Sequence, residues 1–238
     1  MKRLLLIAIA LVSITAASAQ NKKDWSKVTN RAGDHLMLQF SSDHWIGTPD
    51  SVKDHMKGIP RGMNAYVMLD KVFKSAPQFS VAFGAGISTS NMYFKKYEVD
   101  VKGTTTKLPF NNLDSLDHYK KYKVSMAYLE IPIELRYTVD PANERKSIKV
   151  ALGAKVGTLL NVHTKGKTLE DKTDKVLNSY TQKETSKRYF NSTRVCATAR
   201  IGYGNFSLFG SYQVNNMFKD GVAADTRLLQ VGLTLSGL

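Results

Sequence analysis

The feature that most constrains the fold is a two-residue alternation of apolar side chains. Residues 128–137 show it most clearly: one side carries Leu129, Ile131, Ile133 and Leu135, and the other carries Glu130, Glu134 and Arg136. A helix would mix these two sets around its circumference, whereas a strand presents them on opposite faces. The pattern therefore predicts strands whose two faces meet different surroundings.

The same alternation recurs along the chain and predicts eight strands. Their expected ranges are 34–41, 61–74, 78–95, 122–139, 146–163, 191–204, 205–218 and 227–237. The connections alternate in length, with short turns near 75–77, 140–145 and 204–205 and long polar loops near 42–60, 96–121 and 164–190. Outer-membrane barrels have short periplasmic turns and long extracellular loops. The expected fold class is therefore all-β, an eight-stranded antiparallel transmembrane up-and-down β-barrel spanning 34–238.

The small and charged faces favour a membrane barrel with its polar side inward. Several polar faces are rich in glycine, which suits a narrow lumen, whereas in a soluble barrel the charged face would point outward. Buried charges must be paired to offset their desolvation. We therefore expect an interior charge network that plugs the lumen, formed by Glu130, Glu134, Arg136, Lys149, Lys155, Arg194 and Arg200.

Aromatic residues gather near the predicted strand ends, as in the interfacial girdles of membrane barrels. Strand propensity alone would also place aromatics there. The residues expected in the girdles include Tyr93, Phe94, Tyr97, Tyr122, Tyr137, Tyr189, Phe190, Phe206 and Phe218.

The first residues predict export. Lys2 and Arg3 precede an apolar run over residues 4–14 and a small-residue site that ends at Ala19, the order of a cleaved signal peptide. We therefore expect a signal peptide at 1–19 and a short periplasmic segment at 20–33. The single cysteine, Cys196, permits no internal disulfide, and a composition with 42% hydrophobic residues excludes a disordered chain.

Two stretches resemble a known family. The run from Tyr128 to Tyr137 resembles the YLEIP strand of PorT-like outer-membrane β-barrel proteins, a porin-family group of Gram-negative bacteria. Residues 202–212 are similar to the closing hairpin of that family. The resemblance implies localisation in the cell outer membrane, and some relatives support protein secretion, whereas the long loops match no motif.

No catalytic, cofactor or metal motif is written in the sequence. None of the five histidines lies in a His-Glu-x-x-His or Gly-x-Ser-x-Gly context. The stretch from Ser41 to His44 at the mouth of the first strand could supply a serine and a base, although a loop histidine is more often simply solvated. We expect no enzyme activity, no cofactor and no metal.

The formal charge of +14, or +12 after loss of Lys2 and Arg3, indicates acidic partners. Much of the positive charge lies in the 164–190 loop rather than in a nucleic-acid groove, so no nucleic-acid partner is expected. The negatively charged phosphates of lipopolysaccharide would be attracted by this positive charge. The same loop also contains acidic residues, so it could equally be a solvated surface of mixed charge. The expected partners are outer-membrane lipid, lipopolysaccharide and an envelope or secretion protein.

The predicted function is a structural or interaction role that supports protein secretion or envelope assembly. The alternatives are a small porin or lipid-binding channel, an outer-membrane lipid-modifying enzyme, and, with the faces reversed, a soluble periplasmic barrel. Conductance, lipid turnover and solubility without detergent separate these alternatives. The sequence does not identify the partner, the substrate or the oligomeric state.

Overall fold

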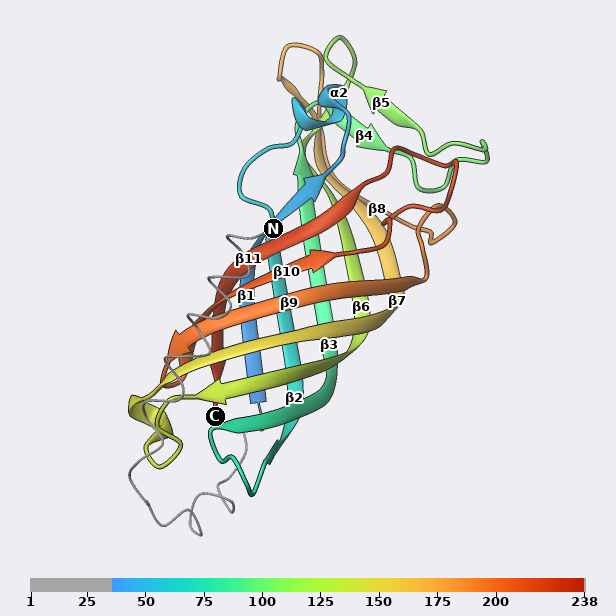
Figure 1. Ribbon diagram of the computed structural model, residues 1–238. Helices are drawn as coiled ribbons and strands as arrows, with labels where there is room; N and C mark the ends of the chain where they lie inside the picture. Colours follow the sequence, from blue (N-terminus) through green and yellow to red (C-terminus); the bar gives the residue numbers. More distant parts are fainter. Residues whose placement is uncertain (1–35, 238) are drawn as a thin grey trace, which may run out of the picture.

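The computed structural model describes residues 36–237, which fold into a closed antiparallel β-barrel with a folded cap at one end (Figure 1). The predicted signal peptide at 1–19 and the segment 20–33 lie outside the described residues. The barrel strands are β1 (Leu36–Ile46), β2 (Arg61–Val72), β3 (Phe79–Phe94), β6 (His118–Thr138), β7 (Ile148–Glu170), β9 (Thr193–Tyr203), β10 (Phe206–Gln213) and β11 (Arg227–Ser236).

Each barrel strand pairs with its neighbours in chain order, and β1 pairs with β11 to close the cylinder. Residue 37 lies opposite Ser236 in this closing seam, and residue 46 lies opposite Arg227. The structure therefore confirms the predicted eight-stranded up-and-down barrel. Among the described residues, no helix has the length and apolar character needed to cross a membrane.

The two ends of the barrel differ, and we call them the turn end and the capped end. Short connections after β2, β6 and β9 lie at the turn end, where the 3-10 helix η2 (Glu144–Lys146) follows β6. The longer connections hold α2 (Asp50–Lys53), β4 (Tyr97–Val99) and β5 (Phe110–Asn112) and fold together at the capped end (Figure 1).

The segment 164–190, expected as a loop, is largely strand. β7 continues to Glu170 and pairs with β8 (Val176–Thr185), so β6, β7 and β8 extend the sheet beyond the barrel. The sequence pattern missed this extension because β8 is exposed along most of its length and lacks a buried face that would impose alternation.

The faces are assigned as a membrane barrel requires, with apolar side chains outward and polar side chains inward. Exposed apolar residues cover the wall, among them Phe40, Val67, Phe83, Leu129, Ile131, Ile133, Leu152, Val156, Ile201, Leu208 and Leu233. Neighbouring residues on the same strands, such as Gln39, Glu130 and Arg200, are buried in the interior. This arrangement matches the apolar outer band of membrane barrels and confirms the predicted inversion of the faces.

The capped end encloses an apolar core of its own. Trp45 at the end of β1 packs edge-on against Phe94 and Phe218, with ring centroids 5.8 and 5.9 Å apart. Phe190 and Phe218 lie 5.1 Å apart, and both are buried. Edge-to-face pairs of this kind add to the free energy gained by burial, so the long connections form a packed cap.

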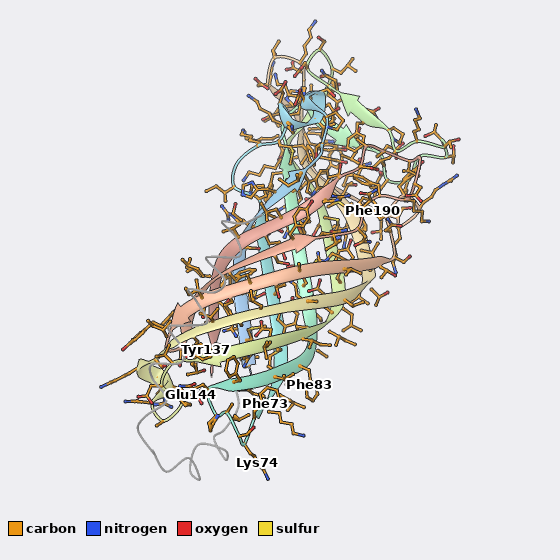
Figure 2. The ribbon with its side chains drawn as sticks, viewed as in Figure 1. Phe73, Lys74, Phe83, Tyr137, Glu144 and Phe190 are labelled. Carbon is orange, nitrogen blue, oxygen red and sulfur yellow. The ribbon has the colours of Figure 1, made fainter. Side chains whose placement is uncertain are left out.

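The aromatic girdle prediction is wrong for most of its members at the capped end. Phe94, Tyr97, Tyr122, Tyr189, Phe190 and Phe218 belong to the buried core of the cap. Phe206 and Tyr203 are exposed at the turn end, where Phe73, Phe79 and Tyr137 also lie (Figure 2). The alternation gave no sign of the cap because packing between loops has no sequence period.

One seam of the barrel is interrupted. The register between β3 and β6 runs through Ala82 opposite Glu134 and Phe83 opposite Ile133, and it resumes only at Gly86 opposite Glu130. The two missing pairs would include Pro132, which has no backbone N–H to donate across the seam. On its other side, Pro132 remains opposite Lys155 of β7.

Candidate functional site

The turn-end half of the lumen contains a continuous chain of hydrogen bonds. Gln39 Nε2 donates to Thr234 Oγ1 at 3.2 Å, and Asn64 Nδ2 donates to Gln39 Oε1 at 3.1 Å. Ser88 Oγ donates to Asn64 Oδ1 at 2.7 Å, and Arg194 Nη2 donates to Ser88 Oγ at 2.8 Å. The chain thus joins β11, β1, β2, β3 and β9 across the interior, and bonds in such a chain polarise one another.

This chain of hydrogen bonds ends at Glu130, whose carboxylate contacts two cationic side chains and one hydroxyl group. Arg194 Nε donates to Glu130 Oε1 at 2.8 Å, and Arg194 Nη2 makes a second, shorter contact with the same oxygen. Tyr66 Oη donates to Glu130 Oε2 at 2.5 Å, and Lys155 Nζ lies 3.5 Å from that oxygen. Glu130 and Arg194 are each only 1% exposed, so their charges are compensated within the protein.

A second ion cluster lies four residues further along β6, around Glu134. Arg136 Nε and Arg200 Nη2 each approach Glu134 Oε2 at 2.9 Å. Arg136 Nη1 also lies 3.9 Å from Asp70 Oδ2. Of the seven residues expected in the network, six therefore lie in these two clusters. Lys149 lies apart and pairs with Glu144 of η2 at 3.3 Å.

The polar half of the lumen is closely filled. A cavity of about 10 Å³ lies at the turn end and is lined by residues that include Asp70, Arg136, Glu144 and Arg200. That volume accommodates about one water molecule. An eight-stranded barrel has an interior that side chains alone can fill, and the described residues fill most of it at this level.

Glycine makes room for the largest buried groups of the clusters. A Cβ on Gly157 would lie 2.7 Å from Cγ of Glu130, and one on Gly86 would lie 2.6 Å from Cδ1 of Tyr66. Contacts this close require a neighbour to move. The small residues that predicted a narrow lumen thus allow Glu130 and Tyr66 to reach the centre.

Sequence reasoning found the charged members of the lumen and missed the neutral ones. Gln39, Asn64, Ser88 and Tyr66 carry the hydrogen bonds between the charged groups, and all four are buried. Their signal was available, because each occupies an inward position of a predicted strand. Neutral polar residues are common at exposed positions, so their type alone did not identify them.

The cap contains its own ion pairs. His118, Glu170 and Asp174 place ligand-type atoms within 4.8 Å of one another, a spacing that a metal ion could bridge. Lys96 Nζ, however, lies 3.0 Å from Asp174, and Lys120 Nζ lies 3.2 Å from Glu170. These ammonium groups already compensate both carboxylates, so the arrangement is an ion-pair cluster.

Hydrogen bonds in this cluster affect acid–base behaviour. The bond from Lys96 holds the pKa of Asp174 below its usual range, and His118 acts in the same direction. Similarly, the bond from His55 holds the pKa of Asp114 below its usual range. Both carboxylates are in the cap, outside the apolar band.

Within the stretch 41–44, one serine does contact the histidine. Ser42 Oγ lies 3.1 Å from His44 Nε2 on the exposed face of β1, whereas Ser41 Oγ donates to Asp43 Oδ1. A nucleophile and base of this kind need a third group that orients the histidine. Within residues 36–237, the hydrogen bonds and ion pairs provide no such group for His44.

A closed barrel with an apolar wall, a filled polar lumen and a folded cap at one end defines an integral outer-membrane β-barrel protein. The sequence bears out this class, because residues 19–219 match the model of a family described as "Outer membrane protein beta-barrel domain". The match covers more than half of the chain, and the chain belongs to this family. A search of curated proteins gave no match.

Two solved structures are similar to this chain. The Ail attachment invasion locus protein of Yersinia pestis is 15% identical, with a TM-score of 0.37, and the alignment covers 87% of this chain and 98% of Ail. Ail in complex with the heparin analogue sucrose octasulfate is 13% identical, with a TM-score of 0.35, over 84% of this chain and 94% of that one.

Proposed function

We propose that this protein is a non-conducting, non-enzymatic outer-membrane scaffold of the PorT-like type whose cap binds an envelope or secretion protein. In this proposal residues 1–19 are a cleaved signal peptide, residues 20–33 are periplasmic, and the capped end faces the cell exterior. Outer-membrane lipid and lipopolysaccharide surround the wall, and nucleic acid is not a partner. The role is to support secretion or envelope assembly.

The observation that carries the proposal is the contrast between a filled interior and an exposed cap. The lumen is occupied by ion clusters at one level and by apolar side chains at the next, which argues against transport through the barrel. The cap nevertheless exposes apolar side chains beyond the apolar band. These include Ile59, Leu116, Val176 and Leu177. Contiguous exposed apolar side chains are typical of protein-binding sites, and Val176 and Leu177 are contiguous at the start of β8.

The test combines conductance with site-specific crosslinking. A photoreactive residue placed at Leu116 or Leu177 should crosslink to the same envelope protein, and the same residue at Lys74 in the turn between β2 and β3 (Figure 2) should not. Leu116→Ser with Leu177→Ser should reduce both the crosslink and secretion in cells. Cap crosslinks no stronger than those from Lys74, or secretion unchanged in the double variant, would contradict the proposal.

Two measurements address the alternatives. Large, stable single-channel currents from purified protein in planar bilayers would favour the small porin or lipid-binding channel. Lipid or ester turnover that is lost in His44→Ala would favour an outer-membrane lipid-modifying enzyme, with Ser42 as the nucleophile because it contacts His44. We expect neither result.

A further inference from the structure

Five lysines form a patch on the outer wall just beyond the apolar band, and we call it the lysine wall. Its members are Lys121 and Lys123 on β6, Lys165 and Lys167 on β7, and Lys183 on β8. The register places Lys165 between Lys123 and Lys183, and it places Lys121 opposite Lys167. Directly opposite residues on one face of a sheet have Cβ atoms about 5 Å apart.

No carboxylate among the described residues pairs with the positive charges of the lysine wall. Like charges directly opposite each other destabilise a sheet, yet in the described part of the chain none of the five lysines forms an ion pair with a carboxylate. Other lysines of the cap do form them, such as Lys96 with Asp174 and Lys120 with Glu170. The wall therefore concentrates positive charge that its own fold does not neutralise.

The acid–base behaviour of the neighbouring groups agrees with this. Burial, together with Lys165 and Lys167, lowers the pKa of Lys123 from its ordinary value. Burial, together with Lys183, Lys123 and Lys165, also lowers the pKa of His163. Every charged group that acts on these two side chains is positive, so an anion placed here would be attracted by all of them.

A hollow suited to a small anionic group lies within the wall. It has a volume of about 210 Å³ and is lined by Tyr93, Tyr122, Lys121, Lys123, Lys165 and Lys167. Tyr93 on β3 lies opposite Lys123, whose Nζ is 5.9 Å from the Tyr93 ring centroid. Asn91 fixes the same lysine by accepting a hydrogen bond from Nζ at 2.7 Å.

The height of the wall matches that of lipid headgroups. Lys123 follows the outward face of β6 four residues beyond Ala127, near the end of the apolar band. Four residues span about 13 Å along a strand, or about 10 Å along the barrel axis at the usual tilt. The headgroup region is about 5–8 Å deep on each side of the hydrocarbon core, so Lys123 lies at the outer edge of that region, and a flexible lysine side chain can reach back to phosphate groups within it.

We propose that the lysine wall binds the phosphate groups of the phosphorylated glycolipid of the outer leaflet, lipopolysaccharide. The inference rests on the proposed function, since it requires the capped end to face the cell exterior. Ammonium groups form charge-assisted hydrogen bonds with phosphate oxygens, and the two rows of lysines offer several such bonds at once. A bound phosphate would also relieve the repulsion between Lys123 and Lys165.

The test uses the full-length protein in nanodiscs and lipid A as the probe. Binding of phosphorylated and dephosphorylated lipid A is measured by native mass spectrometry for three proteins: the wild type, the variant K123Q/K165Q/K167Q, and the control K57Q/K102Q/K172Q. The control removes equal charge from exposed cap positions outside the wall. We expect the wall variant to lose at least about tenfold in affinity for phosphorylated lipid A, because each charge-assisted bond contributes appreciably, and the control to bind as the wild type does.

Three outcomes would overturn the proposal. The wild type could bind phosphorylated and dephosphorylated lipid A equally, or the wall variant and the control could lose equal affinity for phosphorylated lipid A. The wild type could also bind phosphatidylglycerol as tightly as phosphorylated lipid A, which would indicate a site for any anionic lipid. The heat-dependent gel shift of each variant shows that its barrel has folded. Crosslinking from Leu116 in the wall variant reports the cap partner separately. That crosslink can persist when glycolipid binding fails, so the two proposals can fail independently.

Discussion

The inward-facing residues of β6 change in character along the strand. Toward the turn end they are Glu130 and Glu134, held by ion pairs, and toward the cap they are Val124, Met126 and Tyr128, held by packing. Both halves are filled, but their energetics differ. Removing one member of a buried ion pair leaves an uncompensated charge, whereas truncating an apolar side chain leaves a void. One lumen therefore contains two kinds of sensitivity to mutation.

The strongest test of this difference is Glu130→Ala. It would leave Arg194 and Lys155 buried without their carboxylate, and we expect a loss of about 3–5 kcal/mol in the free energy of unfolding. Urea unfolding of the detergent-solubilised barrel measures it. The triple variant Glu130→Leu, Lys155→Met, Arg194→Met should lose less than the single variant, and a larger loss would mean that charge pairing is not the cause.

The matching test is Leu108→Ala, in the apolar core that continues from the cap-side half of the lumen into the cap. Leu108 is buried in the cap core, and its truncation should cost about 2–4 kcal/mol through the void that it leaves. Hydrogen exchange should show faster opening of β4 and β5, with the amides of β9 and β10 unchanged. Uniformly faster exchange throughout the barrel would mean that the cap and the barrel unfold as one unit.

The polar half of the lumen can also be tested by adding a side-chain atom where there is no room for it, instead of removing one. Gly157→Ala would press a methyl group against Glu130 and should destabilise the barrel by about 1–3 kcal/mol. Gly221→Ala is a poor control because its φ is +74°, whereas Gly210 has open space around it. Gly210→Ala should therefore have little effect on the same urea midpoint, and an equal effect would exclude close packing as the cause.

The smallest expected effect is a titration confined to the cap. The pKa of Asp174 is lowered in the folded protein, so its contribution to stability is complete above the ordinary value of 3.8 and is lost as pH falls through the lower folded value. NMR titration should show the side-chain signals of Lys96 and His118, which contact Asp174, shifting below pH 3.8. The backbone amides nearby are a poorer probe because the pKa of Asp171 is lowered as well. In Asp174→Asn this transition should disappear, and its persistence would assign the titration to another acid.

The barrel was predictable because apolar and polar side chains alternate along its strands, and the two sets face two different environments, lipid and lumen. Ile131 and Glu130 differ in polarity and point to opposite sides, so the strand and its faces follow from these residues. The charged lumen residues were predictable for the same reason. Their partners were not, because whether Arg194 approaches Glu130 or Glu134 depends on register between strands distant in sequence, which no local pattern encodes.

The cap was the part of the fold that the sequence pattern did not predict. Phe190 and Phe218 are close in space because two loops fold against each other, and aromatic residues near strand ends were interpreted as a membrane girdle instead. The lysine wall was concealed in a similar way. Lys123, Lys165 and Lys183 lie in separate segments, and only the register of the extended β6, β7 and β8 places them side by side.

The interrupted seam at Pro132 has a mechanical consequence. A closed ring of strands resists force equally around its circumference only when every seam carries its full set of hydrogen bonds. The β3–β6 seam lacks paired residues opposite Pro132, whereas the β6–β7 seam is paired there through Lys155. If strands β3 and β6 are pulled apart, we expect their seam to open first at Pro132 and to part in both directions from there, so this proline sets the point at which that seam would begin to unzip.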